Sequence, residues 1–206
     1  MENICILDYG VGNIFAFQNV YKRLNIPTKI AKTQEDLADA KKLILPGVGS
    51  FDYAMAQLNA SGMREKLDEL VLEKKVPVIG ICVGMQMMGN RSDEGKLEGL
   101  KWIDSEILKF DENLIQQRTK LPHMGWNDVA PIKNHPLFIG LEKEAIFYFL
   151  HSFYFKCNNQ TDSIAVSDYG LSFSSAVNKD NIYGIQFHPE KSHQYGEKLL
   201  HNFAKL

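Results

Sequence analysis

A short apolar run that ends in a cysteine flanked by glycines constrains the fold of this chain more than any other stretch. Residues 76–81 are apolar apart from one glycine, and the run is short enough for a buried strand. Gly80-Ile81-Cys82-Val83-Gly84 follows, and apolar residues of helical character come after it. The stretch therefore predicts a buried strand that turns sharply into a helix at Cys82.

A nucleophile between glycines on such a turn has the form of a nucleophile elbow. Gly80 and Gly84 suit the turn because side chains at those positions would crowd the backbone around Cys82. The sulfur would lie near a helix N-terminus, where partial positive charge favours the thiolate. The alternative is an inert cysteine at the end of a core strand, since free cysteines are often buried. The motif alone leaves both interpretations open.

Strands and helices alternate over the first ninety residues. The apolar runs predict strands at residues 3–7, 28–31, 43–45 and 76–82, and helical spacing predicts helices at residues 14–24, with Asn13 as N-cap, and 63–73. Thr33, with Asp36 three residues later, has the form of a further helix start. Gly10-x-Gly12 follows the first strand, but Phe15 occupies the third glycine position of a dinucleotide-binding motif, so that reading is weak. This alternation predicts a parallel sheet with helices on its faces.

The second half of the chain consists mainly of short stretches with strand character. Residues 107–110, 126–129, 145–150, 152–155, 163–166, 173–177 and 182–187 have strand character, residues 178–181 suit a hairpin, and a helix is expected around 196–205. No linker or repeat interrupts the chain. We expect one domain over residues 1–206, with an α/β fold whose open, mostly parallel sheet is flanked by helices and extended by antiparallel strands.

Composition excludes several classes of protein. A net charge of −2 provides no basic excess for nucleic acid, and no apolar run reaches the roughly 20 residues of a membrane helix. Three scattered cysteines do not suggest a disulfide framework, and the chain starts without a signal-peptide pattern. No His, Cys and Asp spacing suits a metal ion. We therefore expect a cytoplasmic protein without a metal.

A thiolate nucleophile needs a base, and the base needs an orienting partner. Of six histidines, His188 ends a predicted strand and is followed by Pro189 and Glu190. In an extended chain residues i and i+2 point to the same side, so Glu190 can accept a hydrogen bond from the His188 ring. An exposed turn is the alternative for this tripeptide alone. His123 and His151 lack an adjacent acid and are weaker candidates for the base.

Three motifs in one order resemble the triad (class I) glutamine amidotransferases: residues 45–49, 80–86 and 186–190. Residues 8–13, 122–127, 150–152 and 191–192 extend the resemblance over essentially the whole chain, to the glutaminase subunits of imidazole glycerol phosphate synthases. The resemblance implies a flavodoxin-like fold and no cofactor. It further implies that Cys82 attacks the amide carbon of L-glutamine, that His188 transfers protons and that Glu190 orients His188. Backbone N–H groups of Val48 and Val83 match the oxyanion positions. The residues that match substrate-binding positions are Gly47, Gly49, Gln86, His151 and Ser152.

The resemblance also implies a separate (β/α)₈-barrel cyclase that consumes the ammonia, because the chain ends soon after the histidine motif. Asn13, Met124, Trp126 and Lys191 match positions near that interface, although Trp126 would equally suit a core. The expected pathway is histidine biosynthesis.

Three departures from the family pattern leave a second pathway open. Residues 14–17 lack the usual arginine, Lys101 replaces the last glycine of Gly-Leu-Gly, and Phe153 replaces the tyrosine of His-Ser-Tyr. These departures would suit a paralogue that supplies ammonia to a different barrel partner. That partner would amidinate a sugar of a surface polysaccharide. Another cysteine hydrolase or deglycase of similar fold, and a non-catalytic binding module, are the remaining alternatives.

Overall fold

The computed structural model describes residues 4–206, so the predicted strand start at Asn3 lies outside the described residues. Within this range eleven strands form one mixed sheet, and β7 and β9 form a separate antiparallel pair. The strands are β1 (Ile4–Leu7), β2 (Thr28–Ala31), β3 (Lys42–Gly47), β4 (Val78–Cys82), β5 (Arg91–Ser92), β6 (Ser105–Lys109), β7 (His123–Asp128), β8 (Ala130–Pro131), β9 (Ile146–His151), β10 (Phe153–Cys157), β11 (Ser163–Asp168), β12 (Ser172–Lys179) and β13 (Ile182–Ile185). The α-helices are α1 (Ile14–Arg23), α2 (Phe51–Ala60), α3 (Arg64–Asp68), α4 (Val83–Met87) and α5 (His193–Lys205).

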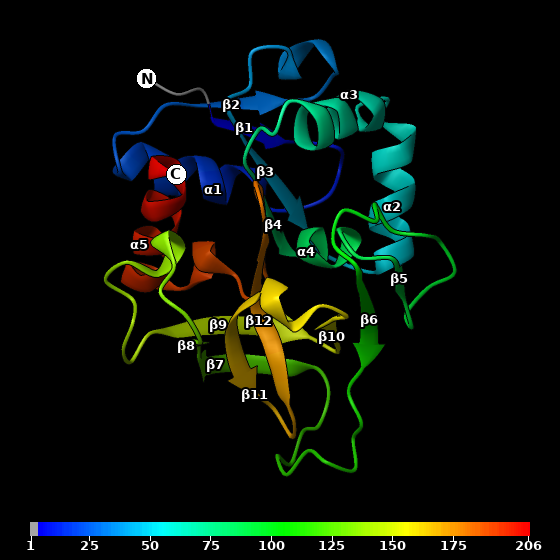
Figure 1. The fold of residues 1–206 in the computed structure, drawn as a ribbon, viewed down its shortest axis with the longest axis vertical. Helices are drawn as coiled ribbons and strands as arrows, with labels where there is room; N and C mark the ends of the chain where they lie inside the picture. The colour runs from blue at the N-terminus through cyan, green and yellow to red at the C-terminus, as the bar shows by residue number, and fades with distance from the viewer. Residues whose placement is uncertain (1–3) are drawn as a thin grey trace.

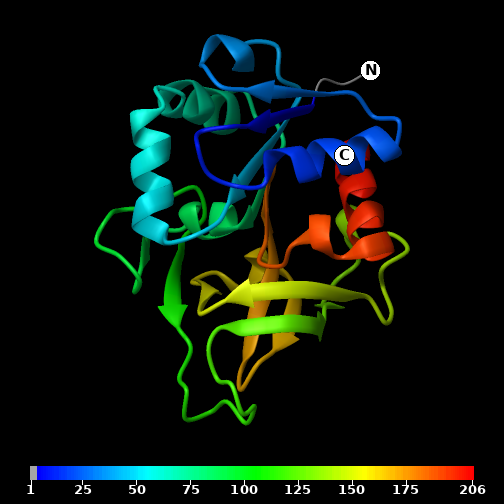
Figure 2. The ribbon, with the colours of Figure 1, turned by 180° about the vertical axis from the view of Figure 1, so that it is seen from behind.

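The parallel part of the sheet has the strand order β2-β1-β3-β4-β13. Every residue of β1, β3 and β4 is buried, as expected for parallel strands covered on both faces. Helices α1 and α5 lie on one side of these strands, and α2, α3 and α4 lie on the other (Figures 1 and 2). The carboxyl ends of β3, β4 and β13 meet at one edge, where open α/β sheets bind ligands.

Antiparallel strands extend the sheet beyond β13. β12 pairs with β13, β10 and β11, and β10 continues to β6. The β7–β9 pair lies below α5 in both Figure 1 and Figure 2. The predicted mixed α/β architecture is therefore confirmed. The predicted hairpin is confirmed too, since Lys179 pairs with Ile182 around a two-residue turn.

The local predictions near α1 and residue 33 had mixed outcomes. Asn13 occupies the N-cap position of α1 as predicted, but its side chain makes no capping hydrogen bond within residues 4–206. No helix starts at Thr33, because the Asp36 carboxylate accepts hydrogen bonds from the N–H groups of Lys32 and Thr33 and closes a tight turn before one 3₁₀ turn, Glu35–Leu37.

The segment between β3 and β4 differs most from the prediction. Helix α2 occupies a stretch where no helix was predicted, although Phe51, Met55 and Leu58 form its buried face. The predicted helix over 63–73 is α-helical only in α3 and continues as a π-helix over Glu69–Glu73, in which the N–H of Lys74 reaches the carbonyl of Glu69. Strand β7 also starts earlier than the predicted residue 126.

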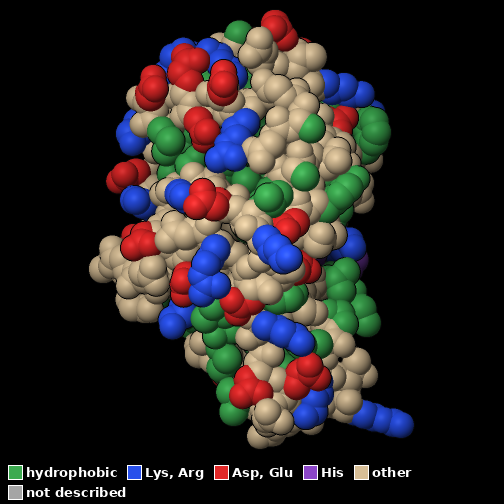
Figure 3. Space-filling view, turned by 90° about the vertical axis from the view of Figure 1, so that its right-hand side faces the viewer, with side chains coloured by type: hydrophobic (Ala, Val, Ile, Leu, Met, Phe, Trp, Pro, Cys, Tyr) green, Lys and Arg blue, Asp and Glu red, His purple; other side chains and the backbone are tan. Residues whose placement is uncertain are grey.

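The surface mixes charges. On the face seen in Figure 3, which lies at the side of α2, β5 and β6, acidic and basic side chains alternate, in keeping with the net charge of −2. None of the helices over residues 4–206 combines the length and the apolar character needed to cross a membrane.

Candidate active site

Cys82 ends β4 and directly precedes α4. Its backbone has φ 55° and ψ −114°, a combination that residues with side chains rarely adopt. The side chain is almost completely buried, with 3% of the residue exposed. The predicted sharp turn is therefore present, and Cys82 is held in a strained conformation at its apex.

Two glycines let the turn pack against the neighbouring strand. A Cβ atom on Gly84 would overlap the carbonyl oxygen of Leu45 in β3, and one on Gly47 would overlap the backbone of Val83 and Gly84. Gly47 lies beside Cys82 in the β3–β4 register. The backbone of the elbow therefore packs directly against the backbone of β3, and this contact fixes the position of the sulfur.

His188 lies just beyond β13, at the same edge of the sheet. Its Nδ1 is 2.9 Å from Oε1 of Glu190, and both side chains are at most 4% exposed. The expected extended geometry was wrong in detail, because Pro189–Lys191 form a 3₁₀ turn that brings the carboxylate back to the ring. The N–H of His188 donates to the carbonyl of Tyr148 in β9, which fixes the backbone of the motif.

The charge of His188 follows from its neighbours. Burial lowers the pKa of the imidazole, but hydrogen bonding and charge interactions with Cys82 and Glu190 outweigh burial and raise the pKa to about 10. The ring is then an imidazolium at neutral pH. An imidazolium between a sulfur and a carboxylate stabilises negative charge on the sulfur and supplies a proton for a leaving group.

A cavity of about 320 Å³ opens onto Cys82 and His188. This volume suits a small metabolite. Most of the sequence-predicted site residues meet there. Gly47, which packs beneath the elbow, and Glu190, which contacts His188, are outside the lining. The described residues that line the cavity are Val48, Gly49, Cys82, Val83, Gln86, Glu94, Pro122, Leu150, His151, Ser152, Phe153, His188 and Lys191.

Two polar residues of this site were missed by sequence reasoning. Glu94 lines the cavity from the polar loop after α4, and one of its oxygens accepts the N–H of Phe51 at 2.8 Å. Nothing in the loop's composition distinguishes Glu94 from Asp93. Gln186 is fully buried, and its side-chain amide donates toward Cys82 Sγ at 3.8 Å. Its position two residues before His188 was the available signal.

Hydrogen bonds fix the amides of Gln86 and Gln186. Gln86 Nε2 donates to the carbonyl of Phe153 at 3.1 Å and to Gln186 Oε1 at 3.0 Å. Both donor hydrogens of Gln86 are thereby used, which leaves its carbonyl oxygen to accept. Gln86 therefore presents a fixed side-chain dipole beside the nucleophile.

Two further histidines are buried and neutral: His151, which lines the cavity, and His123, which lies outside the lining. Burial lowers the pKa of His123 to about 4. Burial, followed by repulsion from His123, lowers the pKa of His151 to about 3. Neither ring is therefore an imidazolium that could act as a general acid at neutral pH, and His188 remains the candidate base.

These lowered pKa values predict acid destabilisation. A histidine whose folded-state pKa lies below the unfolded value of about 6.5 contributes stability above that pH and loses it as pH falls toward the folded value. Wild-type protein should lose about 2 kcal/mol more unfolding free energy than His123→Phe between pH 7.5 and 5.0. Urea denaturation at both pH values measures this difference. Equal losses in the two proteins would show that His123 is not held neutral by burial.

The predicted interface residues lie near the cavity mouth or on exposed surface. Met124 is 61% exposed and Trp126 is 45% exposed, and the Trp126 ring stacks on His193 at 5.3 Å. Trp126 is thus a surface residue, which the sequence left open. Asn13 and Lys191 are exposed, and Lys191 also lines the cavity.

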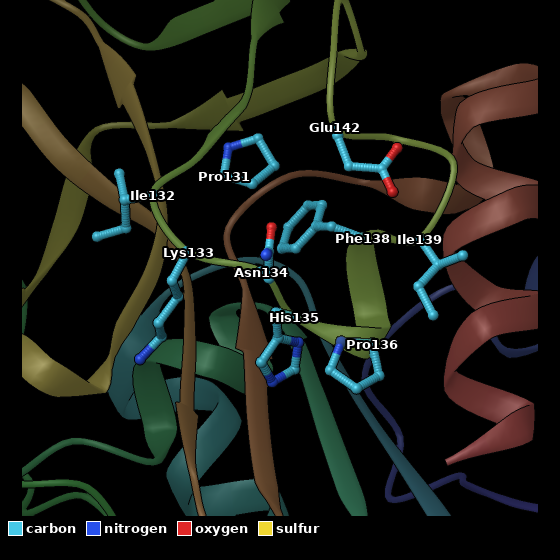
Figure 4. Close-up of a pocket in the computed structure, with 9 residues that line it drawn as sticks. All are labelled: Pro131, Ile132, Lys133, Asn134, His135, Pro136, Phe138, Ile139 and Glu142. Carbon is cyan, nitrogen blue, oxygen red and sulfur yellow. The ribbon is translucent and has the colours of Figure 1, made fainter.

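A larger cavity of about 560 Å³ lies along residues 131–142 (Figure 4). Its lining contains none of the predicted site residues. His135 already uses both ring nitrogens, because Nδ1 accepts the N–H of Leu137 and Nε2 pairs with Asn178. Lys133 and Glu142 lie on opposite sides of the cavity in Figure 4. The smaller cavity is therefore the candidate active site.

Comparisons with known proteins agree on one family. Residues 5–206 match the family model described as "Glutamine amidotransferase class-I". The chain is 57% identical to "Imidazole glycerol phosphate synthase subunit HisH" of Bdellovibrio bacteriovorus over 203 residues, which cover 98% of this chain and 100% of that protein. It is 51% identical to the protein of the same name from Leptospira interrogans, with the same coverage.

Solved structures show the same fold at low identity. "Structure of PurLQS from Thermotoga maritima" matches with a TM-score of 0.75 and 15% identity over 99% of this chain and 98% of that chain. "Crystal structure of glutamine amidotransferase" matches with a TM-score of 0.73 and 18% identity over 98% of this chain and 97% of that one.

Proposed function

The chain belongs to the class-I glutamine amidotransferase family, in the group of HisH subunits, and from this premise we propose that it is the glutaminase subunit of an imidazole glycerol phosphate synthase. It hydrolyses glutamine to glutamate and ammonia and serves histidine biosynthesis. The observation that carries the chemistry is the His188–Glu190 pair, 2.9 Å apart, whose His188 lines the same cavity as Cys82. Identities of 57% and 51% to relatives named for this synthase favour the histidine pathway over the sugar-modifying alternative.

The reaction begins when the Cys82 thiolate attacks the side-chain amide carbon of glutamine. A carbon–sulfur bond forms, and the amide oxygen takes the negative charge. The His188 imidazolium gives its proton to the amide nitrogen, the carbon–nitrogen bond breaks, and ammonia leaves. Neutral His188 then removes a proton from water, which attacks the thioester and releases glutamate and the thiolate. Glu190 holds the ring with Nδ1–H toward itself throughout.

Two backbone N–H groups stabilise the oxyanion in this proposal. Val83 directly follows the nucleophile, and Val48 lies in the loop after β3, and both line the cavity. Losing one such donor costs about 10²–10³ in rate in other hydrolases. Because both oxyanion donors are backbone N–H groups, their positions are set by the close backbone contact at Gly47 and Gly84.

The charges around the cavity suit an amino acid substrate. Glu94 provides a carboxylate and Lys191 an ammonium in the same lining, and glutamine carries the complementary ammonium and carboxylate on its α-carbon. Gly49, Gln86, His151 and Ser152 complete the proposed substrate site with short or neutral polar groups. A cavity with both charges favours a free amino acid over an uncharged amide.

We propose that residues 1–206 act as one domain, supported by the continuous hydrophobic core of the described residues. All three cysteines are free, which supports a reducing cytoplasm as the place of action. The ammonia passes to a (β/α)₈-barrel cyclase that docks near Asn13, Met124, Trp126 and Lys191. Exposed Trp126 and Met124 provide the apolar anchors that such interfaces need.

The docking surface gives a direct prediction. Trp126→Ala should raise the Kd for the barrel cyclase about tenfold to a hundredfold, because truncating a central aromatic anchor typically costs about 1–3 kcal/mol. Ile132→Ala is the matched control, since Ile132 is 53% exposed but lines the separate larger cavity. Isothermal titration calorimetry measures both. A similar loss for the two variants would remove Trp126 from the proposed interface.

The test of the function itself is glutamate formation from glutamine by the purified chain mixed with the barrel cyclase and the nucleotide substrate of that cyclase. We expect one glutamate per glutamine, with the amide nitrogen recovered in the cyclase product, and slow or no hydrolysis of asparagine. Absence of glutamine-dependent glutamate in this complete mixture would contradict the proposal.

A further inference from the structure

A pair of buried histidines connects the surface strand β7 to the substrate cavity. His123 and His151 face each other in the β7–β9 register, and they are 4% and 6% exposed. His123 Nδ1 lies 2.9 Å from His151 Nε2. The proposed mechanism uses His151 as a cavity residue and gives His123 no role.

The partners at either end settle the direction of every hydrogen bond in this pair. His151 Nδ1 lies 2.8 Å from the carbonyl of Phe153, which can only accept, so Nδ1 of His151 carries the proton. A neutral His151 must then accept at Nε2, and His123 must donate from Nδ1. The remaining nitrogen, Nε2 of His123, accepts from the side-chain amide of Asn127 at 3.2 Å. Both rings are thus Nδ1–H tautomers.

The orientation of Asn127 supports this assignment independently. Its Nδ2 also donates to the carbonyl of Asp168 at 2.8 Å, and its Oδ1 accepts the N–H of Asp128 at 2.8 Å. The amide therefore cannot be flipped without losing both bonds, and it presents a donor to His123.

Aromatic rings hold His123 in place on its two sides. Its ring stacks on Tyr169 at 4.0 Å and on Phe149 at 4.8 Å, with interplanar angles of 20° and 21°. The packing allows the His123 ring little rotation, so its Nδ1–H stays directed at Nε2 of His151.

The chain of bonds continues to the nucleophile. The carbonyl of Phe153 accepts from His151 and also from Gln86, Gln86 donates in turn to Gln186, and the Gln186 amide donates toward Cys82 Sγ. Each hydrogen bond in this chain has a fixed donor and a fixed acceptor. Loss of the donor at His123 would leave His151 Nε2 unsatisfied in a buried site and would free the ring to turn.

We propose that His123 is a positioning residue for glutamine hydrolysis, which acts through His151 and the Phe153 carbonyl to hold Gln86 against the substrate. This inference rests on the proposed function, because it assigns Gln86 and His151 to the glutamine site. His123 itself does not line the cavity among the residues described.

Two variants separate a hydrogen-bonding role from a packing role. His123→Phe keeps an aromatic ring between Tyr169 and Phe149 but removes the donor, whereas His123→Asn keeps a donor at the position of Nδ1 but loses most of the ring stacking. We expect His123→Phe to raise the KM for glutamine about tenfold, with kcat within about threefold of wild type. His123→Asn should keep KM within about threefold and lose thermal stability. The reverse pattern, with normal KM in His123→Phe and a raised KM in His123→Asn, would overturn the inference.

A second measurement needs neither a variant nor glutamine. Nitrogen-15 NMR of histidine-labelled wild-type protein at pH 7.5 should show Nδ1–H tautomers for both His123 and His151. An Nε2–H or doubly protonated ring at either position would contradict the hydrogen-bond chain. If the wild-type complex formed no glutamate from glutamine, the proposed function would fail, and the tautomers would still decide the hydrogen-bond inference.

Discussion

Cys82→Ala is expected to lower the glutaminase kcat of the complex with the barrel cyclase by at least about 10⁴-fold, because removal of a nucleophile leaves only transition-state stabilisation by the oxyanion donors. The side chain ends in the cavity beside His188, and the remaining cysteines, Cys5 and Cys157, are buried in the core outside the cavity lining. Their thiol pKa values are raised to about 11, in both cases chiefly by burial, so neither can substitute as a thiolate. Ammonia release from glutamine at saturating substrate measures the loss.

Cys82→Gly is the matched control for folding. Both variants lack the sulfur, but only glycine adopts φ 55° and ψ −114° without strain. Strain of this kind costs about 1–3 kcal/mol, and the extra chain entropy of glycine in the unfolded state offsets part of the gain. We expect Cys82→Gly to be about 1 kcal/mol more stable than Cys82→Ala and equally inactive. Residual activity within about tenfold of wild type in either variant would exclude Cys82 as the nucleophile.

Glu190→Gln should lower kcat between about 10³-fold and 10⁴-fold while leaving the fold intact, as expected when the orienting carboxylate of a triad becomes an amide. The carboxylate accepts from His188 Nδ1, and a glutamine amide that rotates would donate to that nitrogen and move the ring proton to the wrong side. Oε2 of Glu190 has no hydrogen-bond partner among the described residues, so the substitution leaves no former partner of that oxygen unsatisfied. Initial rates at saturating glutamine, with circular dichroism as the folding control, measure the effect.

The same variant should change how stability depends on pH. The folded-state pKa of His188 is raised to about 10 from an unfolded value of about 6.5, partly by Glu190. A raised histidine pKa contributes stability that is fully present below pH 6.5 and is lost as pH rises toward 10. The deficit of Glu190→Gln relative to wild type should therefore be largest near pH 6 and shrink toward pH 10. A deficit that grows with pH would mean that Glu190 does not stabilise an imidazolium.

The proposed catalytic triad could be found in the sequence because its signals are local. Gly80 and Gly84 flank the nucleophile in sequence, and Glu190 lies two residues from His188, so short-range geometry was enough to suggest both pairs. The parallel sheet then brings the two motifs together, since β4 and β13 are neighbours. The backbone conformation between His188 and Glu190 still differed from expectation, because a 3₁₀ turn rather than an extended chain joins the two residues.

Long-range partners were not predictable in the same way. His123 and His151 are 28 residues apart and meet only through the register of the β7–β9 pair. Glu94 reaches the cavity because its loop folds back onto the start of α2, where it accepts the N–H of Phe51, and α2 itself was not predicted. Trp126 could not be assigned to core or surface, since an amphipathic indole suits both.

The central claim is that Cys82 forms a thioester with the glutamyl group under the control of His188 and Glu190. Its most direct test is acid quenching of the complex within its first turnover on isotopically labelled glutamine, followed by peptide mass spectrometry, with Glu190→Gln included to slow hydrolysis of the intermediate. The proposed mechanism predicts a labelled glutamyl adduct on the Cys82 peptide and none in Cys82→Ala. Steady ammonia release with no adduct on Cys82, or with the adduct on Cys5 or Cys157, would contradict it.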